Sequence, residues 1–532
     1  MSSVPWLTIA GAIPLAGALV LTAIPSMPAN GADADREARN LLCKRLALGF
    51  SVVTLAWFIA MCTQYKVGGA DYQFNQTVSW IPQFGVHYAV GVDGIALVLI
   101  GMSVVLMPVV ILASWHDAEG GARSVKGYFA LMLVLETMMI GVFAATDVFL
   151  FYVFFEAMLI PMYFMIGSYG EGKRQYAAVK FLLYSLAGGL LMLVAVIALY
   201  VYSAKSGATG HHGTFLFSQL EQVTFSPDAQ KWMFLGFFVA FAIKAPLFPF
   251  HTWLPDAAAS AQPGGAVLLV GVLDKVGTFG MIRYCLELFP SAARYFAPLV
   301  ITLSVIGILY GAIVAIGQTD MKRLIAYTSV SHFGFIALGI FAMTSQGQSG
   351  ATFYMVNHGF ATGALFILAG FMISRRGSSR IADYGGMQRV APVLAGLFLI
   401  SGLATLSLPG LSTFVSEFLV LVGTFSRYKV PAILATVGII LAAIYILRMY
   451  QRTMNGPTAP EVEDLPDLRP RELWAAVPLV ALIIAMGIYP KPVLDVINPA
   501  VNHTMQQIHM TDPKPAHPAT AQLTTAQKGT NP

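Results

Sequence analysis

The chain has 532 residues, of which 57% are hydrophobic and only 11% are charged, and its mean hydropathy is +0.71. This composition excludes an ordinary soluble domain, because about fourteen spanning helices of roughly 22 residues would use a share of the chain close to its hydrophobic fraction. The cysteines are widely spaced and form no Cys-x-x-Cys set, which excludes a cysteine-bound iron–sulfur cluster, a structural zinc and a disulfide framework. The composition therefore predicts an all-α polytopic membrane protein.

Apolar runs of spanning length occur along almost the whole chain. They predict membrane helices near residues 4–24, 45–62, 91–115, 127–147, 148–169, 178–203, 232–255, 264–289, 296–317, 324–342, 353–374, 391–424, 431–449 and 474–495. The first run has no basic segment or cleavage motif typical of a signal peptide, so we expect a retained anchor. Residues 498–532 are polar and rich in Thr, Gln, Pro and Ala, which predicts a disordered tail.

Lysine and arginine indicate the orientation of these helices. They concentrate in the loops that follow odd-numbered predicted helices, for example Arg123, Arg174 and Arg375, and are sparse in the other loops. By the positive-inside rule the basic loops are cytoplasmic, so we expect both termini on the opposite side of the membrane.

Four basic residues remain inside or at the edges of predicted helices: Lys180, Lys244, Lys275 and Arg283. Lys180 and Arg283 lie near helix ends, from which a long side chain can extend to the membrane surface. Lys244 and Lys275 lie roughly 16–18 Å along their helices at 1.5 Å per residue, close to the middle of the hydrocarbon core.

Three glutamates, Glu136, Glu156 and Glu417, also lie deep in apolar segments. A charge at mid-membrane costs about 2.5–3.5 kcal/mol, so the two central lysines and three glutamates would cost roughly 12–17 kcal/mol without compensation. These groups must pair, become hydrated or change protonation. Two interpretations follow: buried ion pairs that fix helix register, or a path for protons or ions.

Helix-breaking residues next to two of these charges favour the path. They lie just after Lys244 and just before Glu417: Pro246 and Pro249 in the first helix, Pro409 and Gly410 in the second. Broken backbone at membrane depth is tolerated only where it is buried in protein or lines a hydrated cavity, and transporters place ion sites at such breaks. One break in each half of the chain also indicates two related halves.

Three histidines add groups that titrate near neutral pH: His251, His332 and His358. Each has the alternative interpretation of a core imidazole bonded to a hydroxyl or carbonyl group. Small neighbouring residues leave room for water around His332 and His358, so we favour these two for a proton path. No pair has the spacing typical of a metal site, and we expect no metal.

Residues 90–450 resemble the antiporter-like subunits of respiratory complex I, NADH:quinone oxidoreductase. The resemblance rests on four runs: FYVFFEAMLIPMYFMIGSYG, KAPLFPFHTWLPDA, TDMKRLIAYTSVSHFGF and LPGLSTFVSEFLVL. It implies two inverted five-helix repeats, residues 127–290 and 296–450, each with a broken fourth helix. Three N-terminal helices in residues 1–126, a loop and helix in 451–497 and the tail in 498–532 would complete the chain.

The resemblance also assigns the charged residues. It places the family's fifth-helix glutamate at Glu156, its seventh-helix lysine at Lys244, its eighth-helix lysine at Lys275 and the end of the path at Glu417. Glutamate at this last position, and the lack of a long C-terminal amphipathic helix, are most similar to the M-type subunits, counterparts of mitochondrial subunit 4.

The sequence departs from the family pattern in two places. ASAQPGGAV stands where the family more often has a glutamate-containing run, and Asp274 precedes Lys275 where an apolar residue is usual. Adjacent residues do not share a helix face, so we do not expect Asp274 to pair with Lys275.

The function implied is that of a proton-translocating subunit in the inner membrane of a bacterium. It would hold no cofactor itself, with flavin mononucleotide, iron–sulfur clusters and quinone in partner subunits, and would couple quinone reduction there to proton pumping here. Its partners would be other membrane and peripheral subunits, above all neighbouring antiporter-like subunits, and no nucleic acid is expected.

The expected proton path runs Glu156, Lys244, Lys275, His332 or His358, then Glu417, with His251 and Glu136 in supporting positions. An ionised Glu156 close to Lys244 favours the ammonium form, and moving the carboxylate away favours proton release. We expect Glu136 to couple to a neighbouring subunit. Two alternatives remain: a sodium/proton antiporter subunit of the multisubunit type, and a passive scaffold that would tolerate loss of the buried charges.

Overall fold

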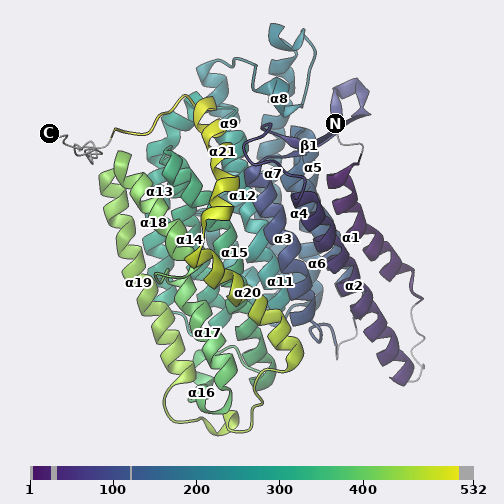
Figure 1. Cartoon of the computed structure of the whole chain (residues 1–532), viewed down its shortest axis with the longest axis vertical. Coiled ribbons are helices and arrows are strands. Elements are labelled where there is room, and N and C mark those ends of the chain that lie inside the picture. The colour runs from purple at the N-terminus through teal and green to yellow at the C-terminus, as the bar shows by residue number, and fades with distance from the viewer. Residues whose placement is uncertain (1–3, 26–32, 120–122, 515–532) are drawn as a thin grey trace, which may run out of the picture.

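The computed structural model describes residues 4–25, 33–119 and 123–514. Long helices packed side by side form most of the molecule (Figure 1), and the all-α polytopic class is confirmed. Twelve helical segments of the described chain are long and apolar enough to cross a membrane. The predicted spans 232–255 and 391–424 are not among these twelve, because each is interrupted.

The N-terminal half begins with two peripheral helices and a β-hairpin, followed by helices that pack around the centre. Its elements are α1 (Trp6–Ala23), α2 (Asp33–Cys62), β1 (Gln73–Ile81), β2 (Val86–Val92), α3 (Gly94–Ala113), α4 (Val125–Ala144), α5 (Val148–Ala157), α6 (Leu159–Tyr169), α7 (Arg174–Ser203), α8 (Phe217–Leu220), α9 (Pro227–Lys244), α10 (Trp253–Ser260), α11 (Pro263–Leu268) and α12 (Asp274–Gly280). Two π-helical segments flank α12: η4 (Leu269–Leu273) and η5 (Met281–Leu286).

The C-terminal half contains the longest buried helix and the second interrupted helix. Its elements are α13 (Pro290–Ile316), α14 (Met321–Phe341), α15 (Ser345–Arg376), α16 (Met387–Val390), α17 (Pro392–Thr405), α18 (Ser412–Arg427), α19 (Lys429–Met454), α20 (Pro470–Ile488) and α21 (Lys491–Gln507).

Burial separates central helices from peripheral ones. The segment from α11 to η5, α14 and α15 are almost entirely buried, whereas α1, α2 and α19 leave much of their apolar surface exposed. Figure 1 shows α1 and α2 at one side of the bundle, α13, α18 and α19 at the other, and α12, α14 and α15 between them. Exposed apolar helix surface is stable against lipid or against other membrane helices, so the peripheral helices suit the boundary of a membrane subunit, with the charged residues kept inside.

At each of the two interruptions a side chain donates a hydrogen bond to a backbone carbonyl inside the protein. The first ends at Lys244, and the indole Nε1 of Trp253 donates a 2.9 Å hydrogen bond to the carbonyl of Ile243. The second break lies between α17 and α18, where Asn357 of α15 donates a 2.9 Å bond to the carbonyl of Ser412. Such partners remove the cost of unpaired backbone at membrane depth. Linker residues in the two breaks include Pro246, Pro249, Pro409 and Gly410.

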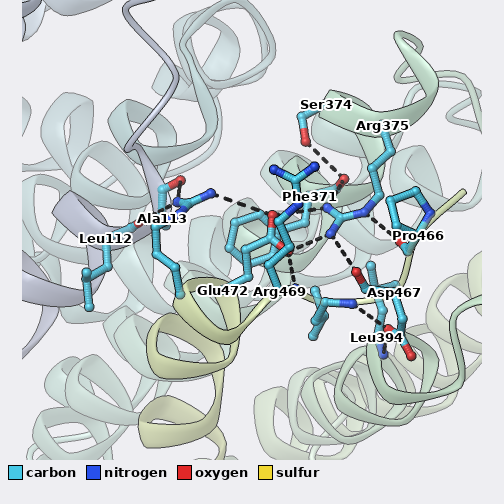
Figure 2. Close-up of polar contacts among 12 residues, drawn as sticks. Leu112, Ala113, Phe371, Ser374, Arg375, Leu394, Pro466, Asp467, Arg469 and Glu472 are labelled. Atoms are coloured by element: carbon cyan, nitrogen blue, oxygen red, sulfur yellow. Dashed lines mark hydrogen bonds and ion pairs between the residues drawn. The ribbon is translucent and has the colours of Figure 1, made fainter. Parts of the chain in front are cut away.

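At the end of the bundle distant from the hairpin, arginines bind the helix ends together. Arg375 of α15 pairs with Glu472 of α20 at 2.5 Å and also donates to the carbonyls of Pro466 and Asp467 (Figure 2). Arg471 donates to the carbonyl of Leu112 at the end of α3. These bonds fix α15, which carries part of the site, against α20 and α3.

Three features of the fold differ from the sequence-based expectation. Residues 73–92 form an antiparallel hairpin that was not predicted, with Gly85 in the left-handed conformation at its turn. Helix α2 begins at Asp33 and not near residue 45. The prediction of a disordered tail from residue 498 is wrong for residues 498–507, which continue α21 and pack against α15 and α3. Residues 508–514 are not helical, but Arg294 and Arg427 donate hydrogen bonds to the carbonyls of Ile508 and Thr511. Residues 515–532 lie outside the described residues.

The interpretation of Arg283 as a side chain that extends to the membrane surface is also wrong. It is buried, and its guanidinium pairs with Asp93 at 2.6 Å and Glu287 at 3.0 Å. Thr504 of α21 donates a 2.6 Å hydrogen bond to Glu287. The position of Arg283 near a helix end suggested that its side chain reaches water, but two carboxylates inside the protein bind the guanidinium instead. Lys180 pairs with Asp256 at 2.7 Å.

Candidate functional site

The four charged residues assigned by the resemblance lie on four separate helices of the bundle. Glu156 is on α5, Lys244 on α9, Lys275 on α12 and Glu417 on α18. Lys244, Lys275 and Glu417 are 1%, 0% and 4% exposed, whereas Glu156 is only half-buried. Three of these groups are therefore enclosed by protein, and the fourth lies nearer the boundary of the chain.

Lys275 lies at the centre of the site. Its Nζ is 2.7 Å from Nδ1 of His358 on α15, donates to the carbonyl of Val270 and lies 5.1 Å from the ring centroid of Phe333. Val270 belongs to η4, one of the π-helical segments beside α12. Segments of π-helix are rare in proteins as a whole but occur often at functional sites, because their altered bonding leaves backbone groups available to side chains.

A row of polar side chains continues from Lys275 toward α18. The ring of His358 lies 5.1 Å from that of His332 between centroids, and the ring of His332 lies 5.8 Å from that of Tyr354. The hydroxyl of Tyr354 donates a 2.9 Å hydrogen bond to Oε2 of Glu417. The structure thus brings both favoured histidines into one row that ends at Glu417.

Tyr354 is a member of this row that the sequence analysis missed. It lies four residues before His358 on α15, a spacing that puts both side chains on one helix face. That spacing was the available signal. Ser407, in the linker between α17 and α18, was missed as well and donates a second hydrogen bond to Glu417.

Glu156 and Lys244 lie on helices that pack directly on each other, since Phe155 of α5 lies 5.9 Å from Phe241 of α9 between ring centroids, but the two charges form no ion pair in the described structure. Lys244 Nζ lies 4.8 Å from the ring centroid of Phe155 and has no hydrogen-bond partner in the described part of the chain. The two charges nevertheless interact electrostatically. Gly189 of α7 faces the Glu156 carboxylate so closely that a methyl group there would overlap it, and the adjacent Gly188 packs on Ala240 of α9.

His251 and Glu136 lie apart from this row. The ring of His251 stacks near Phe248 and lies 5.0 Å from the ring of Tyr310 between centroids. Glu136 is fully buried on α4, and neither carboxylate oxygen has a hydrogen-bond partner among the described residues. The supporting roles of both residues stay predictions.

A helical bundle with two interrupted helices and an internal row of lysine, histidine and glutamate is the arrangement of an antiporter-like membrane subunit. Within the described residues, no group of three or more His, Cys, Asp or Glu side chains could hold a metal ion. The arrangement is suited to moving protons between side chains and not to bond chemistry on a substrate.

Comparisons with known proteins agree with this class. Residues 145–443 match the family described as NADH:quinone oxidoreductase/Mrp antiporter, TM. NADH-quinone oxidoreductase subunit M of Mycobacterium tuberculosis is 51% identical and aligns over 98% of each chain. The chain belongs to this family of subunits.

Solved structures extend the similarity to the fold. A chain of respiratory complex I from Thermus thermophilus with bound NADH is similar with a TM-score of 0.83 and 31% identity, over 94% of this chain and 99% of that one. A chain of the Mrp complex from Dietzia sp. has a TM-score of 0.81 at 20% identity, over 96% of this chain and 100% of that one. At that identity the second similarity concerns the fold alone.

Proposed function

We propose that this chain is a proton-translocating membrane subunit of a bacterial NADH:quinone oxidoreductase. The observation that carries the proposal is the buried row in which Lys275, His358, His332 and Tyr354 lead to Glu417. Buried titratable groups are expensive at membrane depth, so a connected row of them is difficult to explain by packing alone. Its members include groups that bind and release protons.

The path begins with the pair Glu156 and Lys244. An ionised Glu156 stabilises the ammonium form of Lys244, and withdrawal of the carboxylate leaves a poorly solvated cation that releases its proton. Lys275 accepts this proton and passes it to the histidines. Moving one charge through a membrane potential of 150–200 mV costs about 3.5–4.6 kcal/mol, and this is the work that the switch at Lys244 has to supply for each proton.

The order of the two histidines follows from their contacts. His358 touches Lys275, and His332 lies between His358 and Tyr354. The sequence left open which histidine follows the lysine, and these distances favour His358 first. Tyr354 holds the Glu417 carboxylate at the end of the row.

The redox chemistry belongs to partner subunits. We place flavin mononucleotide, the iron–sulfur clusters and quinone there, since homologous subunits are parts of a respiratory complex with bound NADH. The partners of this chain are other membrane and peripheral subunits, above all neighbouring antiporter-like subunits, to which Glu136 couples. The half-buried Glu156 also suits a position near such a neighbour.

The two repeats, residues 127–290 and 296–450, each contain one interrupted helix in fourth place. Counting spans from α4, the fourth is α9–α10; counting from α13, it is α17–α18. By the positive-inside rule the loops that carry Arg123, Arg174 and Arg375 are cytoplasmic, so both termini lie on the non-cytoplasmic side of the bacterial inner membrane.

The test is to purify the chain with its natural partners and reconstitute the complex in liposomes. Copurification of flavin and iron–sulfur clusters, and proton uptake driven by NADH without added sodium, are the expected results. Sodium-dependent transport by a complex without NADH dehydrogenase activity would indicate the multisubunit antiporter instead. Normal pumping after loss of Lys244 would indicate a passive scaffold.

A further inference from the structure

Asp274, which precedes Lys275, is the carboxylate that the family resemblance leaves without a role. It opens α12, the short α-helical segment between the π-helical segments η4 and η5. It is 0% exposed, and neither of its carboxylate oxygens has a hydrogen-bond partner within the described chain. A fully buried carboxylate without such partners is costly unless nearby cations offset its charge.

The packing of α12 places Asp274 beside the end of the helix that carries Lys244. Gly277 lies one turn after Asp274 on the same face, and a Cβ there would lie 2.5 Å from the carbonyl oxygen of Phe241 and 2.7 Å from the amide nitrogen of Ala245. Gly277 is therefore pressed against the end of α9, next to Lys244, whereas Thr278, one turn after Asp274 in the other direction, bonds to Met355 of α15. Asp274 lies between these two directions.

Lys275 points away from this face. Adjacent helical residues differ by about 100° in direction, and the ammonium of Lys275 reaches His358 on α15. No ion pair joins Asp274 to its neighbour in the described structure, as expected from the sequence, yet its charge interacts with both lysines. One turn of α12 thus places a carboxylate between the side that packs on α9 and the lysine that reaches α15.

We propose that Asp274 is a proton-accepting group between Lys244 and Lys275 and a third carboxylate of the path. This inference rests on the proposed function of the chain. The Lys244 ammonium gives its proton to the Asp274 carboxylate, which leaves a neutral amine and a carboxylic acid. The acid then gives the proton to the neutral amine of Lys275, and the carboxylate is restored. A carboxylate between Lys244 and Lys275 also offsets the repulsion between their ammonium groups, which is strong at low dielectric.

The variants for the test are Asp274→Asn, which keeps the shape but cannot titrate, and Asp274→Glu, which keeps the carboxyl group. The matched control is Thr278→Val, one turn further on α12. Thr278 is also fully buried and bonds to the carbonyl of Lys275 and to the sulfur of Met355. All variants are measured in the whole complex at equal complex content, as NADH-driven proton uptake by inverted membrane vesicles.

Loss of an acid–base group slows a step by about 10²–10⁴-fold, so we expect Asp274→Asn to lower pumping at least about tenfold and Asp274→Glu to retain more than the asparagine variant. Thr278→Val should pump like the unchanged complex. Pumping by Asp274→Asn within a factor of about two of the unchanged complex would overturn the proposal.

A second measurement separates proton transfer from a purely electrostatic role. Infrared difference spectra of the working complex should contain a protonated-carboxyl band that shifts when aspartate is isotopically labelled and is missing in Asp274→Asn. Lack of that band would overturn the proposal even if pumping falls. If Lys244→Ala pumps normally, the proposed function itself fails. If only the lysine variants lose pumping, Asp274 alone is wrongly assigned.

Discussion

Replacement of Glu417 by glutamine should stop proton transfer at the end of the row while leaving the packing intact. Glu417 is 4% exposed and accepts hydrogen bonds from Tyr354, at 2.9 Å, and Ser407. Glutamine has the same volume and a carbonyl oxygen that still accepts, but it cannot bind and release a proton. Loss of an acid–base group slows a step by about 10²–10⁴-fold, so we expect pumping to fall at least about tenfold.

Aspartate should be the milder replacement at the same position. It shortens the side chain by one carbon–carbon bond of about 1.5 Å, which opens the contact with Tyr354 to roughly 4 Å. A bridging water spans such a gap at a cost of about 0–2 kcal/mol, which corresponds to at most about thirtyfold. The carboxyl group remains titratable, so Glu417→Asp should pump faster than Glu417→Gln.

The assay is NADH-driven proton uptake and quinone reductase activity in inverted membrane vesicles at equal complex content. The matched control is Ser401→Ala, because Ser401 is buried on α17 and bonds within its own helix to the carbonyl of Leu397. If Glu417 only anchors the interrupted helix, glutamine is the closer replacement and the order reverses. A glutamine variant at least as active as the aspartate variant would refute the proton-acceptor role.

Three further predictions concern other parts of the structure. Lys244→Ala should assemble but lose most coupled proton uptake, because no group beside Glu156 then binds and releases the proton. Near-normal pumping by the assembled variant would contradict the switch. Gly189→Ala should displace the Glu156 carboxylate and reduce proton uptake without changing any charge, whereas Gly396→Ala, which adds a methyl group in open space, should not; equal rates would argue against this geometry. Arg283→Met leaves two buried carboxylates unpaired and should destabilise the chain by about 3–5 kcal/mol, measured as a lower melting temperature of the complex; an unchanged melting temperature would show that the network is not stabilising.

The charges and the helix breaks could be predicted because their signals are local in the sequence. Pro246 and Pro249 follow Lys244 closely and a Pro-Gly pair precedes Glu417, so the sequence itself carries the signal for an interruption at each of these places. The contact of Lys275 with His358 could not be derived in this way, because 83 residues separate them. Its geometry depends on how α12 and α15 pack, which no local pattern specifies.

Two wrong predictions also arose from reading local sequence alone. Residues 498–507 contain many polar side chains and a proline, so their composition suggested disorder. Ile497, Val501 and Met505 nevertheless recur every four residues and are buried in the structure. This spacing predicts one apolar helix face, which a search for membrane-length runs overlooks. Arg283 was misread because one carboxylate partner, Asp93, is the residue that caps α3, far away in the sequence, and the other comes from the next turn of its own segment.

The central claim is that protons pass through the side chains of the buried row, and Lys275 is the residue where this is tested most directly. Lys275→Arg keeps the positive charge, but arginine does not release its proton during turnover. The decisive measurement is the number of protons pumped per electron by the reconstituted complex. The account predicts a lower ratio for an assembled Lys275→Arg complex than for the unchanged one. An equal ratio would mean that residue 275 supplies only charge and would contradict the path.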